Sequence, residues 1–305
     1  AKFYRKHEMN LLRIPVNGTW CRRLRTGGFK VFDIPRGIVT RVYNPETDKE
    51  VIKKQIDLFI SVGHLEFAPA LKCWSVDEGW YEEDFFEGLS GNGFIPNDAP
   101  KLTMDRYFTL IEPLLGKMIL AEQPEPVPLL SYLEKFENLR WTIINETGDE
   151  NVSKFLVFIE KMVSRCRELI LKPGSEIYLV LAHGDFHQFN MIWTGSGLKL
   201  IDWDDTQKRS LLFDFYNFFF SQLYLKNASL DYPLEIKKGV HQLSSRIAIN
   251  SPQLSENIIE CAELYRVVYY IERIHSFLTS FGLDSQRIVR WVDAFLDFEA
   301  NIKGR

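Results

Sequence analysis

A stretch of strand-like sequence at residues 177–205 lies inside a half of the chain that is otherwise patterned for helices. Its segments IYLVLAHGD, NMIW and LKLIDWD read as short strands separated by polar loops, with the glycine-containing turn TGSG between the last two. Hydrophobic periodicity around this segment predicts helices at about 103–121, 128–145, 150–171, 210–227, 232–248, 254–280 and 284–302. Short strands inside a helical lobe would hold the loops between them in place, so we examine the residues of these loops for function.

The N-terminal part of the chain has a different pattern. Residues 20–43 alternate apolar and polar side chains around two turn signals, Thr26-Gly27-Gly28 and Pro35-Arg36-Gly37, which predicts an antiparallel meander. A helix fits residues 47–62, with Thr47 or Asp48 as its cap.

Two further strands fit ALKCWSV and GWYEEDFF, and the second ends at Gly88. We therefore expect an α+β fold with two lobes. A small β-rich lobe would span residues 1–88, and a larger, mostly helical lobe would span residues 89–305.

Composition narrows the function classes. With 305 residues and 46% apolar content, the chain can bury a substantial core. A formal charge of −4 provides no basic field, so nucleic acid is not expected as a partner. The four cysteines form no C-x-x-C pair, which argues against a zinc site and favours a reducing, cytoplasmic location. The longest apolar run, LLFDFYNFFFSQLYL, is broken by Asp214 and Asn217, so no transmembrane segment is expected.

The loops of the 177–205 segment carry the residues best suited to phosphoryl transfer. In HGDFHQFN, the carboxylate of Asp185 is followed five residues later by Asn190, and Asp202 ends the next pair of strands. Phosphoryl transfer needs a carboxylate that orients the acceptor hydroxyl, and oxygen ligands for the metal on the phosphates. Asparagine and aspartate oxygens suit Mg²⁺. The other interpretation is that these three residues only form turns and caps.

These motifs resemble the signature of the aminoglycoside phosphotransferase and choline kinase superfamily, H-G-D-x-x-x-x-N followed by I-D-W/F-D/E. Phe213-Asp214-Phe215 is similar to the start of a later helix in that family. The resemblance implies a protein-kinase-like fold and an ATP- and Mg²⁺-dependent kinase that phosphorylates a hydroxyl of a small molecule. Asp185 would be the catalytic base and Asn190 and Asp202 the Mg²⁺ ligands. His183 would support the loop, and Asp214 would brace it from behind.

The resemblance also assigns nucleotide-binding residues in the N-terminal lobe. Ile38–Tyr43 looks like the family strand that carries a phosphate-binding cation, which would be Arg41, and the hairpin at Gly27 and Gly28 would approach the phosphates. A surface arginine and a plain turn are the alternatives. Gln55 stands where the family has an acid to pair with this cation, so Glu50 is the substitute that we expect.

The segment EDFFEG is similar to the acidic hinge that follows the fifth strand of the family. The backbone of Asp84, Phe85 and Phe86 would then hold the adenine. A strand that simply ends at Gly88 is the alternative.

For the acceptor, the residues flanking the catalytic loop and one face of a C-terminal helix are candidates: His187, Asp204, Asp205, Arg266 and Tyr270. Carboxylates, with an aromatic cage from Trp203, Tyr269 or Trp291, would favour a cationic acceptor such as choline or an aminosugar. Arg266 and Arg273 would instead favour a sugar phosphate or an acidic saccharide. The sequence leaves both open.

Two functions from other classes compete with the small-molecule kinase. The first is a nucleotide-binding module without turnover. Gln55, in place of the acid that the family has on this helix, favours it, although Asp185, Asn190 and Asp202 are all present. A protein kinase lacks support because Asp-Trp-Asp stands where Asp-Phe-Gly would be, and no Ala-Pro-Glu follows.

Overall fold

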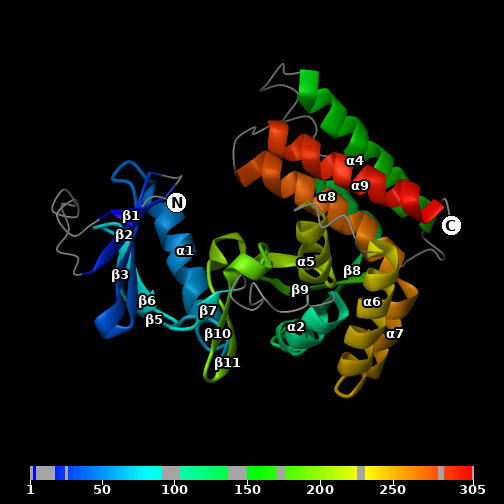
Figure 1. The fold of residues 1–305 in the computed structure, drawn as a ribbon. Coiled ribbons are helices and arrows are strands. Elements are labelled where there is room, and N and C mark those ends of the chain that lie inside the picture. The colour runs from blue at the N-terminus through cyan, green and yellow to red at the C-terminus, as the bar shows by residue number, and fades with distance from the viewer. Residues whose placement is uncertain are drawn as a thin grey trace. The chain divides into compact units, whose positions relative to one another are not determined.

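The computed structural model describes residues 3–4, 18–24, 27–90, 104–136, 150–169, 176–224, 231–280 and 285–303 (Figure 1). The chain divides into two compact units. Unit 1 comprises Ala1–Asp98 and Gln188–Asp205, and unit 2 comprises Ala99–His187 and Thr206–Arg305.

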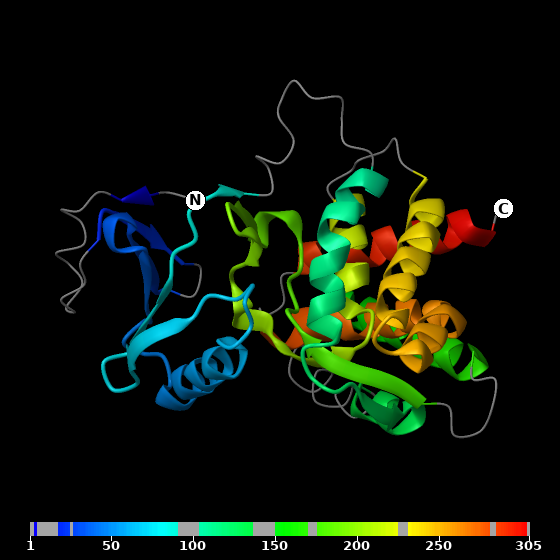
Figure 2. The same ribbon diagram turned by 90° about the horizontal axis from the view of Figure 1, so that it is seen from below.

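Unit 1 is built on a six-stranded antiparallel sheet, drawn blue to cyan in Figures 1 and 2. Its order is β1-β2-β3-β4-β6-β5, from strands β1 (Phe3–Tyr4), β2 (Trp20–Arg23), β3 (Phe29–Asp33), β4 (Ile38–Val42), β5 (Leu71–Ser75) and β6 (Trp80–Asp84). Gly37, at φ 65°, closes the connection between β3 and β4 in a conformation that favours glycine. The meander and the two further strands predicted from the sequence are confirmed.

Helix α1 (Lys49–Val62) packs on this sheet through one face. Asp48 caps it by accepting a hydrogen bond from the N–H of Glu50, so the predicted cap is confirmed. The buried positions follow helical spacing and include Phe59, whose ring lies 4.8 Å from that of Tyr81. The helix thereby stabilises the sheet whose strands carry the charged residues described below.

A second, three-stranded sheet explains why residues 188–205 group with the N-terminal part of the chain. The hairpin of β10 (Met191–Thr194) and β11 (Gly197–Leu200) pairs through β10 with β7 (Leu89–Ser90). The N–H of Leu200 also donates to the carbonyl of Phe67 at 2.7 Å. The compact units thus differ from the division at residues 88 and 89 drawn from the sequence, because strand pairing connects distant segments.

Unit 2 contains a third sheet, in the order β12-β9-β8, and most of the helices. The strands are β8 (Glu125–Pro128), β9 (Glu176–Ala182) and β12 (Gln207–Ser210), and residues 129–136 are helical. The other helices are α2 (Met104–Ile119), α4 (Glu150–Leu169), α5 (Phe213–Tyr224), α6 (Tyr232–Ala248), α7 (Pro252–Glu260), α8 (Ala262–Ser280) and α9 (Ser285–Lys303). The single helix expected at 254–280 is wrong, since the chain breaks at Cys261 between α7 and α8.

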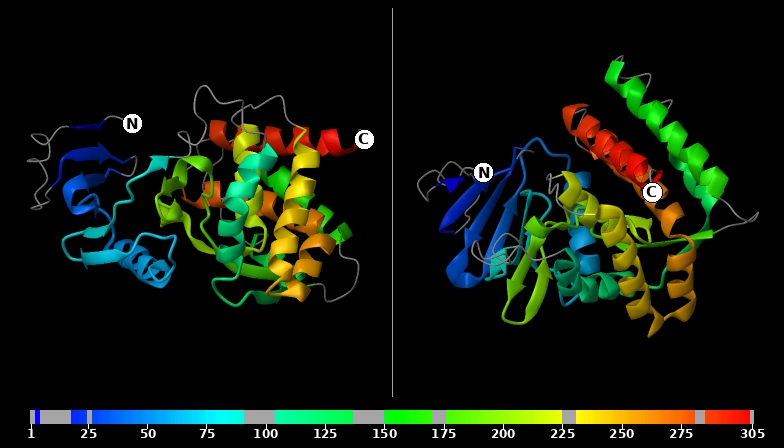
Figure 3. Two further views of the ribbon diagram at one scale, coloured as in Figure 1. Left: turned by 60° about the horizontal axis from the view of Figure 1, so that its bottom comes forward. Right: turned by 45° about the vertical axis from the view of Figure 1, so that its right-hand side comes forward.

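The core of unit 2 is rich in aromatic rings. Tyr270 stacks on Phe295 of α9 at 4.2 Å between ring centroids, and Phe220 of α5 lies against both helices. Figure 3 shows α9 beside α4 and α8, and α2 beside α6. These contacts hold α8 firmly in the unit, which matters because α8 carries a residue of the candidate site.

No helix within the described ranges is both long and apolar enough to cross a bilayer. All four cysteines are free thiols.

Candidate active site

The loop after β9 is held from behind by one carboxylate. Asp214, in the first turn of α5, accepts hydrogen bonds from the N–H groups of His183 at 2.6 Å and Gly184 at 3.0 Å. Gly184 has φ 84°, which a side chain would oppose. The buried ring of His183 accepts a bond from the N–H of Asp185 at 3.3 Å. The bracing role expected for Asp214 and the supporting role expected for His183 are confirmed.

Asp185 itself is held through both carboxylate oxygens. Oδ1 accepts a bond from Arg273 Nη2 at 3.1 Å, and Oδ2 lies 3.1 Å from Nε2 of His187. Burial alone would raise the pKa of Asp185, but the hydrogen bond with His187 and the charge of Arg273 lower it well below its usual range. Because 29% of the side chain is exposed, Asp185 is an anion of fixed orientation that still reaches solvent.

Arg273 is expected from the sequence only as a charge that would favour an acidic acceptor, and its pairing with Asp185 is not predicted. It comes from α8, and its guanidinium also donates from Nη1 to the carbonyl of Gly184 at 2.9 Å. The side chain is only 3% exposed and lies over the rings of Phe277 and Trp291, at 4.5 and 5.2 Å from their centroids. Nothing in the local sequence distinguishes Arg273 from a surface arginine on the same helix.

In unit 1, Asn190 and Asp202 stand at the same end of the β10–β11 hairpin. Asn190 directly precedes β10 and Asp202 follows β11 by one residue, with Met191 opposite Leu200 in the register. The N–H of Ile201 donates to the carbonyl of Asn190 at 3.0 Å and joins the two ends. Asp202 has φ 68°, a conformation that aspartate tolerates better than most residues.

Lys30 of β3 is a second residue that the sequence did not reveal. Its Nζ lies 2.9 Å from Oδ1 of Asp202 and 3.8 Å from Oε1 of Glu83. Burial alone would lower the pKa of Lys30, but the two carboxylates raise it above its usual value. Burial raises the pKa of Glu83 to about 7, and the charge of Lys30 limits that rise. A buried cation therefore holds one of the two candidate metal ligands.

Arg41 of β4 pairs with Asp204 instead of an acid on α1. Its Nη1 lies 2.7 Å from Oδ2 of Asp204, and Nε2 of Gln55 donates to the other oxygen of that carboxylate at 3.3 Å. The expectation that Glu50 anchors Arg41 is wrong, because Asp204 takes this role and Glu50 is an exposed residue of the first turn of α1. Asp204, predicted to recognise the acceptor, has a partner within unit 1.

The turn between β2 and β3 has the expected glycines. Gly27 has φ 86°, and the N–H of Leu24 donates to the carbonyl of Gly28 at 2.7 Å. A Cβ on Gly28 would lie 2.4 Å from the carbonyl oxygen of Val42, so a side chain would force the strands apart. Thr26 lies outside the described residues. The turn is confirmed, and its role toward phosphates stays a prediction.

In the segment predicted to be the hinge, Asp84, Phe85 and Phe86, some backbone amides already have hydrogen-bond partners within the fold. The N–H of Asp84 donates to the carbonyl of Ala70 at 3.1 Å, and the N–H of Phe85 donates to the carbonyl of Gly37 at 2.8 Å. Lys199 lies over the ring of Phe86, 5.6 Å from its centroid. Of these residues, Asp84 and Phe85 therefore already donate their amides within unit 1.

Known proteins that resemble this chain are phosphotransferases. Residues 114–228 match the model of a family described as the phosphotransferase enzyme family. A choline kinase from Cryptosporidium parvum is 16% identical, with 93% of this chain and 90% of that chain covered and a TM-score of 0.59. An ethanolamine kinase from Plasmodium vivax is 16% identical, with 91% and 80% covered and a TM-score of 0.56. An ADP-bound aminoglycoside phosphotransferase is 14% identical, with 96% of each chain covered and a TM-score of 0.51.

This chain has the fold of those kinases. The α+β, kinase-like fold and the resemblance to the aminoglycoside phosphotransferase and choline kinase superfamily are thereby confirmed. The matched segment contains Asp185, Asn190, Asp202 and Asp214. No curated protein sequence matches the chain.

The residues predicted to recognise the acceptor of such a kinase do not all lie together. His187 contacts Asp185, whereas Arg266 and Tyr270 both contact Glu299 of α9 at 3.0 Å. Asp205 follows Asp204 in a short 3₁₀ turn at the end of the unit 1 segment. Of the α8 residues that the structure describes, Arg273 pairs with Asp185.

The expected aromatic cage is wrong. Trp203, Tyr269 and Trp291 are 1%, 0% and 3% exposed. Trp203 stacks on Phe67 within unit 1, and the hydroxyl of Tyr269 donates to Asn217. These rings stabilise the cores of their units and cannot enclose a bound cation.

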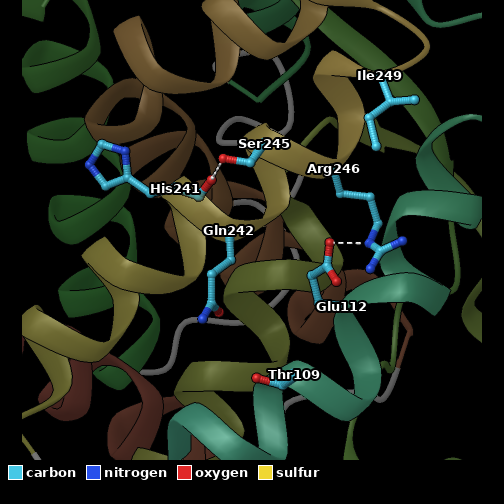
Figure 4. Close-up of a pocket in the computed structure, with 7 residues that line it drawn as sticks. All are labelled: Thr109, Glu112, His241, Gln242, Ser245, Arg246 and Ile249. Atoms are coloured by element: carbon cyan, nitrogen blue, oxygen red, sulfur yellow. Dashed lines mark hydrogen bonds and ion pairs between the residues drawn. The ribbon is translucent and has the colours of Figure 1, made fainter.

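A groove of about 510 Å³ lies on unit 2 between α2 and α6 (Figure 4). An ion pair between Glu112 and Arg246 crosses it, and the aliphatic part of Arg246 lies on Gly116. None of the predicted site residues lines this groove, so it is separate from the loop that follows β9 and contains Asp185.

Proposed function

We propose that the protein is an ATP-dependent kinase that transfers the γ-phosphate to a hydroxyl group of a small molecule. The observation that carries this proposal is the setting of Asp185. Its carboxylate is anionic, oriented by Arg273 and His187, and placed on a loop that Asp214 fastens to α5. A base for phosphoryl transfer needs this combination of fixed orientation and access to solvent.

In the proposed reaction, Asp185 orients the acceptor hydroxyl and takes its proton. The acceptor O–H bond breaks, a bond forms between that oxygen and the γ-phosphorus, and the bond from the γ-phosphorus to the leaving ADP breaks. Oδ2 is the oxygen that we assign to the proton, because Oδ1 is held by the permanently charged Arg273, and the contact of Oδ2 with His187 leaves a second lone pair of Oδ2 for the acceptor hydroxyl. The proton leaves Asp185 for solvent after transfer.

Asn190 and Asp202 are the residues that we propose to hold Mg²⁺. Both offer oxygen ligands at one end of the β10–β11 hairpin, and Asp202 is 45% exposed on its side chain. No group of three or more histidine, cysteine or acidic side chains gathers as a metal site among the described residues. This fits Mg²⁺, which usually binds one or two protein oxygens together with substrate phosphates and water. When bound, the ion supplies positive charge that offsets the charge developing on the phosphates.

The nucleotide phosphates would meet cations and backbone amides of unit 1. Arg41 and Lys30 are the cations, and the β2–β3 turn at Gly27 and Gly28 is the backbone that we propose to approach a phosphate. For the adenine we propose the segment from Phe86 onward, since the amides of Asp84 and Phe85 already donate to other carbonyls. The aminoglycoside phosphotransferase of similar fold was solved with ADP, which supports nucleotide use.

The acceptor is proposed to be a small alcohol. Kinases of similar fold act, by their names, on choline, ethanolamine, glucosamine and aminoglycosides. Burial of Trp203, Tyr269 and Trp291 removes these rings as a means of holding a cationic acceptor. His187 and Asp205 remain our candidates for contact with the acceptor.

One observation favours the second candidate, a nucleotide-binding module without turnover. Both carboxylates of the Ile-Asp-Trp-Asp sequence already pair with cations, Asp202 with Lys30 and Asp204 with Arg41. If these pairs persist when a nucleotide binds, Asp202 is a weaker metal ligand.

An acceptor screen separates the two candidates. The protein is incubated with ATP and Mg²⁺ and with choline, ethanolamine, glucosamine, aminoglycosides or neutral sugars, and the phosphorylated acceptor is measured together with ADP. A kinase yields stoichiometric ADP and phosphorylated alcohol with at least one acceptor. A binding module yields neither, although a nucleotide still raises the melting temperature.

A further inference from the structure

Arg273 of α8 donates two hydrogen bonds to the loop that contains Asp185. Its two terminal nitrogens donate to different groups. Nη2 donates to Oδ1 of Asp185 at 3.1 Å, and Nη1 donates to the carbonyl of Gly184 at 2.9 Å. One guanidinium therefore fixes a side chain and the backbone next to it. A planar fork can do this, whereas a lysine ammonium cannot reproduce the geometry.

The surroundings of Arg273 hold the guanidinium in place. Only 3% of the side chain is exposed, and the rings of Phe277 and Trp291 lie beside it. Removing a charge from water costs free energy that an ion pair often fails to recover, so a buried arginine is weak evidence of stabilisation. It is better evidence of a requirement for one fixed geometry at its partner.

The helix that carries Arg273 is itself anchored next to it. Glu272 is 2% exposed, and it accepts hydrogen bonds from the N–H of Ser210 at 2.9 Å and from its hydroxyl at 2.5 Å. Tyr132 donates to the same carboxylate. These bonds tie α8 to β12, and β12 pairs with β9, the strand that leads into the catalytic loop. Two connections within unit 2 therefore hold Arg273 in position relative to Asp185: its own hydrogen bonds to the loop, and the bonds of Glu272 to β12.

We infer that Arg273 is a positioning residue for phosphoryl transfer, which orients Asp185 toward the acceptor hydroxyl and keeps it anionic. The inference rests on the proposed function. With Oδ1 held by Arg273, Oδ2 is directed to the acceptor, and rotation of the carboxylate is restricted. Arg273 acts through Asp185, without contact with the reacting atoms.

Substitutions at Arg273 test the inference. Arg273→Lys keeps a cation but loses the fork, and Arg273→Gln loses the charge as well. We expect kcat to fall by about 10- to 100-fold in both, the range in which misplacement of a catalytic group acts, while the KM for ATP changes less than threefold. Arg290→Gln, which removes an exposed arginine from α9, is the matched control and keeps the wild-type kcat.

A pH profile adds a readout that a purely structural role would not move. Among the described residues of unit 2, the charged and titratable groups that act on Asp185 include Arg273 and Tyr269 from α8, and His183 and His187 from its own loop. Because Arg273 lowers the pKa of Asp185, its removal raises that pKa. The acid limb of the kcat profile of Arg273→Gln therefore moves to higher pH, whereas Arg273→Lys shows a smaller shift.

The outcomes separate this inference from the proposed function. If both Arg273 variants keep the wild-type kcat and pH profile while Asp185→Asn is inactive, the inference is wrong and the proposed function stands. If Asp185→Asn is as active as the wild type, the assignment of Asp185 as the base fails, and the inference fails with it. The proposed function fails if the wild type phosphorylates no acceptor. Should Arg273→Gln unfold, Arg273→Lys decides, and a wild-type kcat in that variant overturns the inference.

Discussion

Lys30 and Arg41 are direct cross-strand partners on β3 and β4, and each of them holds a carboxylate of the same short loop. Asp202, which pairs with Lys30, and Asp204, which pairs with Arg41, stand two residues apart in that loop. Two charges of like sign on neighbouring strands would repel each other, and the paired carboxylates offset this repulsion. The loop after β11 is in this way fastened to the sheet of unit 1 by two ion pairs.

The first prediction concerns Asp202 as a metal ligand. Asp202→Asn removes the charge and keeps a residue that tolerates the φ of 68°. We expect the affinity for ATP in the presence of Mg²⁺ to fall at least about tenfold, which corresponds to ~1.4 kcal/mol, with no change when Mg²⁺ is chelated. Calorimetric titration checks this, with Asp77→Asn on an exposed turn as control. Equal Mg²⁺-dependent affinity in Asp202→Asn and the wild type would remove Asp202 from the metal site.

A second prediction follows from the pKa of Glu83, which burial raises to about 7 in the folded protein. A group whose pKa is higher in the folded state than in the unfolded state contributes its full stability at low pH, and loses it as the pH rises through the folded value. The free energy of unfolding should therefore decrease between about pH 5 and pH 8, by up to ~3 kcal/mol from this group. Denaturant titrations across this range measure the decrease.

Glu83→Gln is the variant that identifies the source of this pH dependence. Glutamine does not titrate, so the decrease in stability between pH 5 and pH 8 should become smaller, whereas the exposed control Glu46→Gln keeps it. An unchanged pH dependence in Glu83→Gln would show that another group is responsible.

The third prediction is that Arg41 and Asp204 are energetically coupled. Because Arg41 is 8% exposed on its side chain and Asp204 35%, loss of the carboxylate leaves a buried cation with less compensation. We expect Asp204→Asn to lower the free energy of unfolding by about 2 kcal/mol, and a double-mutant cycle with Arg41→Gln to give a coupling of ~1 kcal/mol or more. Additive effects of the two substitutions would mean that the ion pair does not stabilise unit 1.

The fourth prediction concerns the brace of the catalytic loop. Asp214→Asn replaces one accepting oxygen by a donor, so one of the N–H groups of His183 and Gly184 loses its partner in a buried site. Both kcat and the melting temperature should fall, with kcat reduced about tenfold or more. Asp231→Asn, at the N-cap of α6, is the control that should keep the wild-type kcat. If kcat is retained in Asp214→Asn, the loop does not depend on this brace for its geometry.

The sequence was sufficient for the local features of this molecule. The alternating pattern before residue 44, the cap at Asp48 and the turn at Gly27 and Gly28 all follow from short-range preferences, and the structure has them. The spacing within the catalytic loop, together with the resemblance that it carries, also indicated the bracing role of Asp214.

The parts that could not be predicted depend on contacts between distant segments. Lys30 and Asp202 are 172 residues apart, and Arg273 and Asp185 are 88 apart, so only the register of the sheets and the placement of α8 bring them together. Strand β12 has the sequence QKRS, without apolar alternation, and it is a strand only because it pairs with β9. The acid that holds Arg41 was expected on α1 but comes from the loop after β11, for the same reason.

The most direct test of the central claim is the initial rate of γ-phosphate transfer from ATP to the best acceptor by the wild type and by Asp185→Asn. Asparagine keeps the shape of the side chain but cannot take the proton, so we expect kcat to fall by about 100- to 10,000-fold, the range of general base catalysis, with ATP affinity retained. A variant with the wild-type kcat would contradict the assignment of Asp185 as the base, and with it the proposed mechanism.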